Sequence, residues 1–477
     1  MICLSMALTA SVLSASLFPA SSEDLERLLT EIVSRGRNAG VAAAVITPEG
    51  TFQAHAGISG SADGLPLSSQ TLFEIGSITK VVTGTLFADS IRRGEVREDE
   101  RLVEVFPDLV LPGNGDKITL LDLATHRSGI PSCPADLTPA DWEDPWKDLT
   151  KEALWTSLSK LKELNFEPGS EAEYSNAGTC LLGHALVSRS RLGSFEALVQ
   201  TRFAQPLGLS PSQFTADSGN EKIAASVAQG NNDLGRTSHW HLGFISPAGG
   251  IVASLDAMTK FARACLTTVN SAGLRGSHDI PSDDIITAMS EAQTPRQDFS
   301  KHEKVGLNWF SNDDVFWHNG GTGGFRSWMG CHKESGRAAV VLTNSAKGLD
   351  SLGMHLVKGS PLELPLSGLH AAVQLATTQI DRLLGTYSMG QLTIAVERCS
   401  SQNSICAYAT GGFKMNNFHY LIPDSELRWR SDSVSYEFHL GDDGTITGFD
   451  ESVDGKLFRR DFSGKSPESG SADLDGK

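Results

Sequence analysis

Basic residues are scarce in this chain of 477 residues. It carries 40 lysines and arginines against 57 aspartates and glutamates, which gives a formal net charge of −17 at pH 7. Nucleic-acid binding needs clustered positive charge to neutralise phosphates, so this balance argues against that class of function. An acidic membrane surface would also repel the chain.

Cysteines are few, and their spacing does not match that of a metal site. Of the seven, four are scattered along the chain and are interpreted as small core residues: Cys133, Cys180, Cys265 and Cys331. Cys399 and Cys406 flank a turn between two expected strands, so a cross-strand disulfide and two free buried thiols both remain open. The sequence predicts no metal and no cofactor.

Two short motifs lack residues that a metal site or a phosphate loop requires. His239 and His241 place two imidazoles on one strand face, but zinc needs further ligands, and ordinary surface or pocket histidines are the preferred interpretation. The GGTGG run after His318 lacks the Gly-Lys-Ser/Thr ending of a phosphate loop. We interpret these glycines as a close approach of the backbone to an acyl group.

Long apolar runs are absent except at the start of the chain. MICLSMALTASVLSASLFPASS ends in small residues and is interpreted as a cleaved signal peptide over residues 1–20, although no basic residue precedes the apolar run. A short membrane anchor and a misplaced start also remain open. We therefore expect a secreted or periplasmic protein without stable membrane insertion after signal removal.

A nucleophile and a base are present three residues apart, in FEIGSITKVVTGTLFADSIRRGEV. On a helix this spacing puts Ser77 and Lys80 on one face, with Cβ atoms about 5–6 Å apart. Lysine can take a proton from serine once burial and nearby positive charge lower its pKa. The apolar residues after Lys80 predict a buried helix. Ser77 follows Gly76 directly and lies at the start of this helix, where free backbone N–H groups could stabilise negative charge.

The Ser-x-x-Lys pattern is weak alone, because Ser157 and Lys160 repeat it in LWTSLSKLKEL. We interpret that copy as the solvated face of an ordinary amphipathic helix. Two further motifs add weight to the first copy. Tyr174-Ser175-Asn176 occurs once, after a Pro-Gly turn, and His318-Asn319-Gly320 opens a glycine-rich strand.

In this order, the three motifs closely resemble the serine β-lactamase and penicillin-binding protein superfamily. Within it, they resemble the class C-like branch of esterases, D-aminopeptidases and β-lactamase-related proteins. LLDLATHRSGIPS, YSNAGTCLLGHAL, SPAGGIVASLDAMTKFA and VGLNWF look like the same branch, and the resemblance covers roughly residues 23 to 350.

The resemblance implies a role for each motif residue. Ser77 would be the nucleophile, Lys80 its base, and Tyr174 the proton shuttle to the leaving group. Asn176 would orient the substrate and Lys80. The backbone N–H groups of Ser77 and Gly321 would form the oxyanion hole.

His318, followed by Gly320, stands where the penicillin-recognising enzymes have the lysine of Lys-Thr-Gly. A histidine is mostly neutral near pH 7 and holds an anion less firmly, which argues against β-lactam turnover. We expect a metal-independent hydrolase of small or peptide-like esters or amides. An esterase ranks first, a D-amino-acid peptidase or amidase second, and a β-lactamase or D-Ala-D-Ala carboxypeptidase third. Acyl transfer by the same residues, and a non-catalytic peptide-binding or self-assembling relative, also remain open.

The expected fold is α+β. Strand patterns at both ends of residues 21–359, with helical patterns between them, predict a β-lactamase/transpeptidase-like antiparallel sheet flanked by helices, with an all-helical region. Residues 360–368 are the expected linker. Short strands over residues 369–463 predict a C-terminal antiparallel barrel or sandwich, similar to the lipocalin-like domain appended to some relatives. Residues 464–477 are polar and are expected to be disordered.

Overall fold

The computed structural model describes residues 19–34, 38–60, 66–133, 139–141, 143–216, 223, 226–232, 235–269, 283–312, 314–332, 334–359, 362, 375–381, 383–389, 392–398, 405–410, 419–423, 427–430, 434–441, 446–453, 456–461 and 465–466. The expected signal peptide, apart from its last two residues, lies outside this set. So do Cys399, the side chain of Cys406 and most of the expected linker and tail.

The largest sheet of the hydrolase-like part combines strands from its two ends, as the sequence predicts. Eight antiparallel strands are arranged in the order β2-β1-β13-β12-β11-β10-β9-β8. Their bounds are β1 (Gly40–Thr47), β2 (Gly50–Gly57), β8 (Gln297–Asp298), β9 (Lys304–Val305), β10 (Phe310–Asn312), β11 (Val315–Gly321), β12 (Arg326–His332) and β13 (Arg337–Thr343). The register pairs Gly321 with Arg326 at one end of the β11–β12 hairpin.

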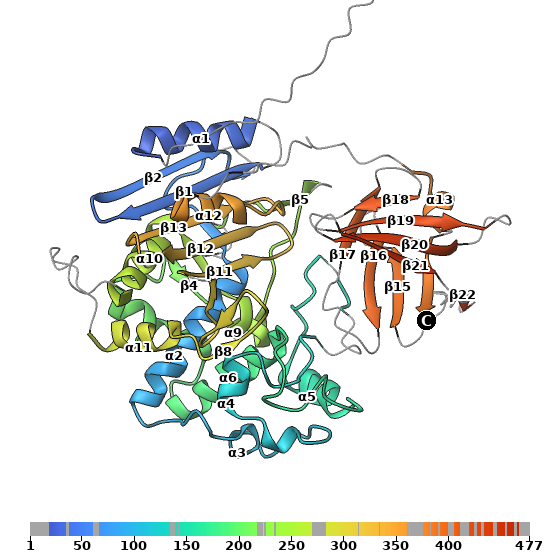
Figure 1. The fold of residues 1–477 in the computed structure, drawn as a ribbon, viewed down its shortest axis with the longest axis horizontal. Helices are drawn as coiled ribbons and strands as arrows, with labels where there is room; N and C mark the ends of the chain where they lie inside the picture. The colour runs from blue at the N-terminus through green and yellow to red at the C-terminus, as the bar shows by residue number, and fades with distance from the viewer. Residues whose placement is uncertain are drawn as a thin grey trace, which may run out of the picture.

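Strand β1 is buried on both faces, which explains its unbroken apolar sequence GVAAAVIT. Its side chains alternate between two cores: Ala42, Ala44 and Ile46 belong to the larger one, while their neighbours belong to the smaller one. Helices α1 (Ser22–Ser34) and α12 (Asp350–Lys358) cover the smaller core, and Figure 1 shows α1 beside β2 and β1.

The larger core lies under a mostly helical region. Among the described residues up to 359, the other α-helices are α2 (Thr79–Arg92), α3 (Leu102–Val105), α4 (Leu120–Ala124), α5 (Lys151–Ser159), α6 (Asn176–Ser190), α7 (Phe195–Val199), α9 (Ser246–Gly249), α10 (Leu255–Val269) and α11 (Asp283–Gln293). Short 3-10 segments are η1 (Gly76–Ile78), η2 (Gly115–Lys117), η4 (Gln205–Leu207) and η5 (Gly243–Ile245), and a π-turn, η3, spans Gln200–Ala204. Helix α2 is buried from Thr79 to Ser90, which confirms the helix predicted after Ser77.

Among the described residues, this part of the chain also contains two small sheets. One contains β3 (Leu72–Glu74), β7 (Val252–Ser254) and β4 (Phe214–Thr215), and it places the strand before Ser77 against β7. The other is the hairpin of β5 (Asn231–Asn232) and β6 (Gly235–Arg236). The β3–β7 pairing holds the chain that enters the Ser77 turn.

The C-terminal region is antiparallel β structure, preceded by helix α13 (Thr377–Asp381). The strands that the structure describes there are β14 (Gly385–Met389), β15 (Leu392–Arg398), β16 (Ile405–Thr410), β17 (His419–Pro423), β18 (Arg428–Arg430), β19 (Val434–Leu440), β20 (Ile446–Val453), β21 (Lys456–Asp461) and β22 (Lys465–Ser466). The strand order runs from β21 at one edge to β22 at the other, and no pairing between described residues closes the sheet. The barrel, the lipocalin-like likeness and the domain boundaries stay predictions.

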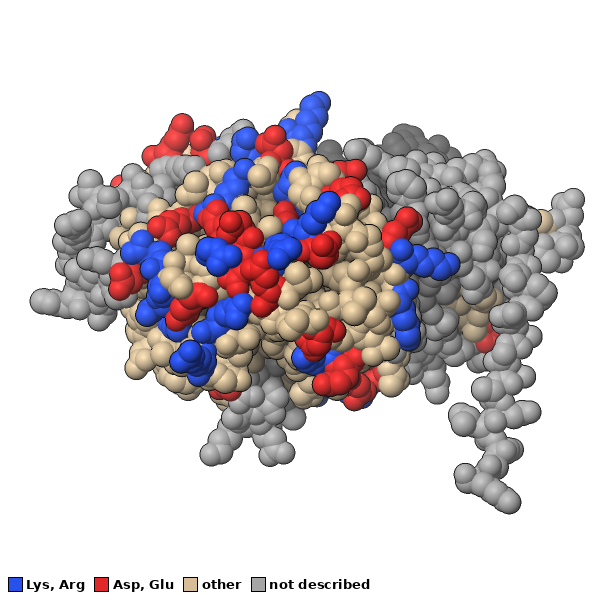
Figure 2. Space-filling model, turned by 90° about the horizontal axis from the view of Figure 1, so that it is seen from below, with Lys and Arg blue, Asp and Glu red and all other residues tan. Residues whose placement is uncertain are grey.

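The surface carries charges of both signs. Figure 2 shows lysines and arginines interspersed with aspartates and glutamates on the face seen from below, instead of one basic patch. In the part of the chain that the structure describes, no helix has the length and apolar character needed to cross a bilayer.

Candidate active site

Ser77 lies in the 3-10 turn η1, directly before helix α2. Two hydrogen bonds fix the chain that enters this turn: the Ile75 N–H donates to the Ile251 carbonyl at 3.1 Å, and Ser327 Oγ donates to the Ile75 carbonyl at 2.7 Å. Gly76 has a φ of +50°, and a Cβ there would lie 2.6 Å from the Gly321 nitrogen. Glycine is therefore needed where the serine turn meets the end of β11.

Lys80 lies one helical turn after Ser77, and its side chain is completely buried. Its Nζ donates to Ser77 Oγ at 3.0 Å and to the carbonyl oxygen of Ala248 at 2.5 Å. Burial holds the pKa of Lys80 well below its usual range, and the neighbouring Cys180 opposes this shift. A neutral amine can still donate to Ala248 while its lone pair accepts the Ser77 hydroxyl proton.

Tyr174 lies in the loop before helix α6 and faces the same two residues. The centre of its ring is 4.8 Å from the Lys80 Nζ. Burial raises the pKa of the Tyr174 phenol, and a hydrogen bond with the Ser77 side chain opposes this shift. The phenol therefore remains protonated at neutral pH and can donate its proton.

His318 lies on β11, and only 1% of its surface is exposed. Its Nδ1 is 2.5 Å from the Asn319 carbonyl oxygen, which can only accept, so Nδ1 carries the proton. Burial, followed by the charge of Lys80, lowers the pKa of His318 to about 3, against the effect of that backbone hydrogen bond. The imidazole is neutral, and its buried Nε2 has no hydrogen-bond partner among the described residues.

Asn176 is the first residue of α6, and its contacts differ from those expected. Its side-chain amide donates to Ser132 Oγ at 2.9 Å, and its backbone N–H donates to the same oxygen at 3.0 Å. In the described part of the chain, no hydrogen bond joins Asn176 to Lys80. Its orienting role toward the substrate stays a prediction.

The two glycines after His318 lie close to the Ser77 turn, on opposite faces of β11. A Cβ on Gly320 would lie 2.0 Å from the Ile75 carbonyl oxygen, a contact that excludes any side chain. A Cβ on Gly321 would lie 3.1 Å from a guanidinium nitrogen of Arg326. That guanidinium donates to the backbone carbonyls of Thr322 and Phe325, at 2.7 and 2.8 Å.

Several groups that contact the motif residues lie outside the three motifs. These are His126 beside Tyr174, Ser132 beside Asn176, the Ala248 carbonyl beside Lys80, and Arg326 beside Gly321. Two of the segments concerned, LLDLATHRSGIPS and SPAGGIVASLDAMTKFA, are among the family-like stretches, but only the fold shows which of their atoms reach the site.

The two histidines of the His-Trp-His segment bind carboxylates. His239 Nδ1 lies 2.9 Å from Glu74 Oε1, and His241 Nδ1 lies 2.5 Å from Asp144 Oδ2. Among the described residues, the group that could hold a metal is Asp314, His332 and Glu334. The Nδ1 of that histidine is already hydrogen-bonded to Ser335, and we assign the group no role.

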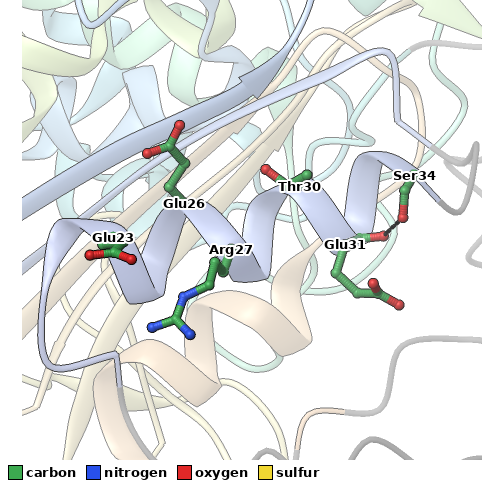
Figure 3. A pocket seen from close by; sticks show the side chains of 6 residues that line it. All are labelled: Glu23, Glu26, Arg27, Thr30, Glu31 and Ser34. Atoms are coloured by element: carbon green, nitrogen blue, oxygen red, sulfur yellow. Dashed lines mark hydrogen bonds between the residues drawn. The ribbon is translucent and has the colours of Figure 1, made fainter.

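Two open surface cavities lie away from the three motifs. The first, of ≈ 320 Å³ and shown in Figure 3, follows helix α1 and is lined by Glu23, Glu26, Arg27, Thr30, Glu31 and Ser34. The second, of ≈ 600 Å³, is lined by Ser22, Thr51, Gln53, Gln213, Asp256, Thr259, Lys260 and Arg263. Neither lining includes a serine beside a buried base.

Comparison with protein-family models matches residues 25–356 to the Beta-lactamase family. The chain belongs to this family. It is therefore related to the β-lactamase and penicillin-binding serine hydrolases, as the motifs predict. The match ends before the C-terminal sheet, which it leaves without an assignment.

Individual relatives agree with this membership. The chain is 30% identical over 244 residues to a β-lactamase of Escherichia coli (strain K12), covering 51% of this chain and 60% of the relative. It is 24% identical over 259 residues to a β-lactamase of Providencia stuartii, covering 54% and 63%. It is 25% identical over 323 residues to the D-alanyl-D-alanine-carboxypeptidase/endopeptidase AmpH of Escherichia coli (strain K12), covering 62% and 79%. The chain thus spans less than two thirds of the length of these two β-lactamases.

Proposed function

We propose that this protein hydrolyses small esters through an acyl-enzyme intermediate on Ser77. One observation carries the proposal: a completely buried Lys80 places its Nζ 3.0 Å from the Ser77 oxygen. Burial lowers the pKa of this lysine, so a neutral amine is available as general base.

The proposed reaction begins with proton transfer from the Ser77 hydroxyl to Lys80 Nζ. The serine oxygen bonds to the ester carbonyl carbon, and the N–H groups of Ser77 and Gly321 donate to the resulting oxyanion. When the intermediate collapses, the carbon–oxygen bond to the alcohol breaks. The leaving oxygen takes a proton from the Tyr174 phenol, which regains one from the protonated lysine.

Water then hydrolyses the acyl-enzyme, and the steps of its formation run in reverse. Water gives a proton to the same base and attacks the acyl carbon, and the bond to Ser77 Oγ breaks as that oxygen regains its proton. The protonated state of Tyr174 and its hydrogen bond with Ser77 fit this shuttle, because a phenol with a raised pKa holds its proton until a stronger base forms. No metal or cofactor takes part in this scheme.

The preference for neutral esters rests on His318. The penicillin-recognising relatives place a lysine cation at this position, whereas His318 is neutral with a pKa of about 3. A neutral imidazole offers a carboxylate less attraction than an ammonium group. We therefore rank an esterase ahead of a D-amino-acid peptidase or amidase.

A second candidate, a D-Ala-D-Ala carboxypeptidase or β-lactamase, has its own support. The relatives named above carry these activities in their names, and a permanent cation, Arg326, lies beside Gly321. That guanidinium is already engaged with two backbone carbonyls, and Asp350 lies within its electrostatic reach. We rank this candidate lower because the two backbone carbonyls already occupy part of the hydrogen-bond donors of Arg326.

The test is a substrate panel of short p-nitrophenyl esters, D-amino-acid anilides and nitrocefin, measured with the wild type and with His318→Lys. If the missing cation sets the preference, the lysine variant raises the ratio of nitrocefin to ester kcat/KM. His55→Lys is the matched control, because His55 is an exposed histidine in another His-x-Gly sequence. An unchanged or lower ratio in His318→Lys would show that pocket shape sets the substrate class.

We extend the proposal to the whole chain on sequence grounds. Residues 1–20 would direct export and be removed, so the enzyme would act outside the cytoplasm. Residues 369–463 would form a separate lipocalin-like domain. Mass spectrometry of the secreted protein's N-terminus tests the first statement, and limited proteolysis near residues 360–368 tests the second.

A further inference from the structure

His126 is a completely buried residue whose contacts converge on Tyr174. It follows helix α4, its exposed fraction is 1%, and its φ is +59°. Non-glycine residues rarely adopt such a backbone, which persists only where the surrounding structure enforces it. Neither the motifs nor the proposed reaction assigns this histidine a task.

One histidine binds the chain on both sides of Tyr174. The His126 carbonyl oxygen accepts the N–H of Glu173 at 2.8 Å. Its ring nitrogen Nδ1 accepts the N–H of Ser175 at 3.3 Å. Between these two hydrogen bonds, the imidazole lies against the tyrosine ring, with centroids 4.7 Å apart and planes at 37°.

The tautomer of His126 follows from these contacts. Since Nδ1 accepts a backbone N–H, the proton of the neutral ring is on Nε2. Burial holds the pKa of His126 well below its usual range, and the positive charge that Lys80 or His318 carries when protonated acts in the same direction. The Nδ1 acceptor is therefore present throughout the working pH range.

Two phenylalanines also lie against the imidazole. Phe310 stacks on it with centroids 6.1 Å apart and planes at 17°, and Phe299 meets it edge-on at 6.2 Å. The histidine thus cannot shift without disturbing this aromatic group. Its rigidity is transmitted to the tyrosine loop through the two backbone hydrogen bonds.

We propose that His126 is a positioning residue that holds the Tyr174 hydroxyl in line for proton delivery to the leaving group. This inference rests on the proposed ester hydrolysis. A general acid matters most when the leaving alcohol is a poor one, because nitrophenolate departs without a proton whereas an alkoxide does not. A misplaced Tyr174 should therefore slow alkyl esters more than p-nitrophenyl esters.

Two substitutions separate this role from simple packing. In His126→Asn, the short amide can place its oxygen where Nδ1 was, and asparagine tolerates a positive φ. In His126→Gln, the amide group reaches toward the Nε2 position and leaves the Ser175 N–H without its acceptor. Both variants remove the imidazole, but only His126→Asn keeps an acceptor for the Ser175 N–H in the tyrosine loop.

The experiment measures kcat and KM for an alkyl ester and a p-nitrophenyl ester of the same acid. His126→Gln should lower kcat for the alkyl ester about 100-fold and for the p-nitrophenyl ester about tenfold or less, with KM unchanged. His126→Asn should recover most of the loss and keep the wild-type ratio between the two esters. In a Tyr174→Phe background, His126→Gln should add little.

Equal losses on both esters in His126→Gln, or full additivity with Tyr174→Phe, would overturn the inference while the proposed function stands. If His126→Gln does not fold, the ester ratio of His126→Asn decides, and a ratio that departs from the wild type overturns it. A wild type that neither hydrolyses esters nor labels at Ser77 would overturn the proposed function, and this inference with it.

Discussion

The pattern Ser-x-x-Lys occurs at Ser77 and Lys80 and again at Ser157 and Lys160, and these two copies have opposite burial. In the first, Ser77 is partly exposed and Lys80 is completely buried. In the second, Ser157 is 2% exposed, and Lys160 lies in solvent just beyond the end of helix α5. A nucleophile must reach a substrate and its base must lose a proton easily, so only the first arrangement suits catalysis.

The largest expected effect comes from removing each serine hydroxyl in turn. Ser77→Ala should lower ester kcat/KM about 10⁴-fold or more, because the hydroxyl forms the covalent bond and its loss leaves little void. Ser157→Ala should leave turnover unchanged, with a cost of about 1 kcal/mol in stability at most. Steady-state kinetics beside thermal melts checks both. Similar activity losses in the two variants would remove the distinction between the copies.

Replacing each lysine compares the two copies of the pattern a second time. Lys80→Ala should reduce kcat about 10²- to 10⁴-fold, the usual contribution of a general base, while Lys160→Ala should be silent.

Tyr174→Phe should reduce kcat by a factor similar to that of Lys80→Ala. If lysine and tyrosine pass one proton between them, the double variant should be little worse than the poorer single one. Additive losses in log rate would argue for independent roles.

The next expected effect concerns strand β11, which packs on the Ser77 turn. Gly320→Ala should greatly reduce activity and stability, because its methyl group would lie 2.0 Å from the Ile75 backbone oxygen. Gly321→Ala, one residue later, meets the end of the flexible Arg326 side chain at 3.1 Å and should be much milder. Kinetics and urea denaturation compare the two. A milder Gly320→Ala would contradict the close packing of β11 on the Ser77 turn.

The smallest expected effect is a pH dependence of stability. His318 has a pKa of about 3 in the folded protein. The unfolded chain gains its proton near pH 6.5, so the free energy of unfolding should fall as pH drops below this value, by about 1.4 kcal/mol per pH unit for this histidine. Urea denaturation at pH 7 and pH 5 should show a shallower fall in His318→Asn than in the wild type. His55→Asn, at an exposed position, is the control. Equal slopes in His318→Asn and the wild type would contradict the buried neutral imidazole.

The sequence alone predicted the features that depend on local pattern. Strand patterns at both ends of the hydrolase-like part gave the large antiparallel sheet, the apolar residues after Lys80 gave the buried helix α2, and the three-residue spacing brought Ser77 and Lys80 together. The motif order gave the family, which the family model confirms. Local chemistry also gave a neutral His318, although its pKa is lower than an exposed histidine would show.

Contacts between distant segments could not be predicted in this way. The Ala248 carbonyl reaches Lys80 across 168 positions, and His126 reaches Ser175 across 49. The burial of Ser157 was also unexpected, since the pattern of its helix predicts a solvated face. For Asn176 the sequence suggested contact with Lys80, and the structure shows contact with Ser132. These outcomes depend on how loops pack on helices, which no local spacing encodes.

We propose that only the first copy of the pattern is reactive, and covalent labelling distinguishes Ser77 from Ser157. The folded protein is treated with a fluorophosphonate, digested, and its labelled peptide located by mass spectrometry. We expect one adduct, on Ser77, which disappears in Ser77→Ala and persists in Ser157→Ala. An adduct on Ser157, or undiminished labelling of Ser77→Ala, would contradict it.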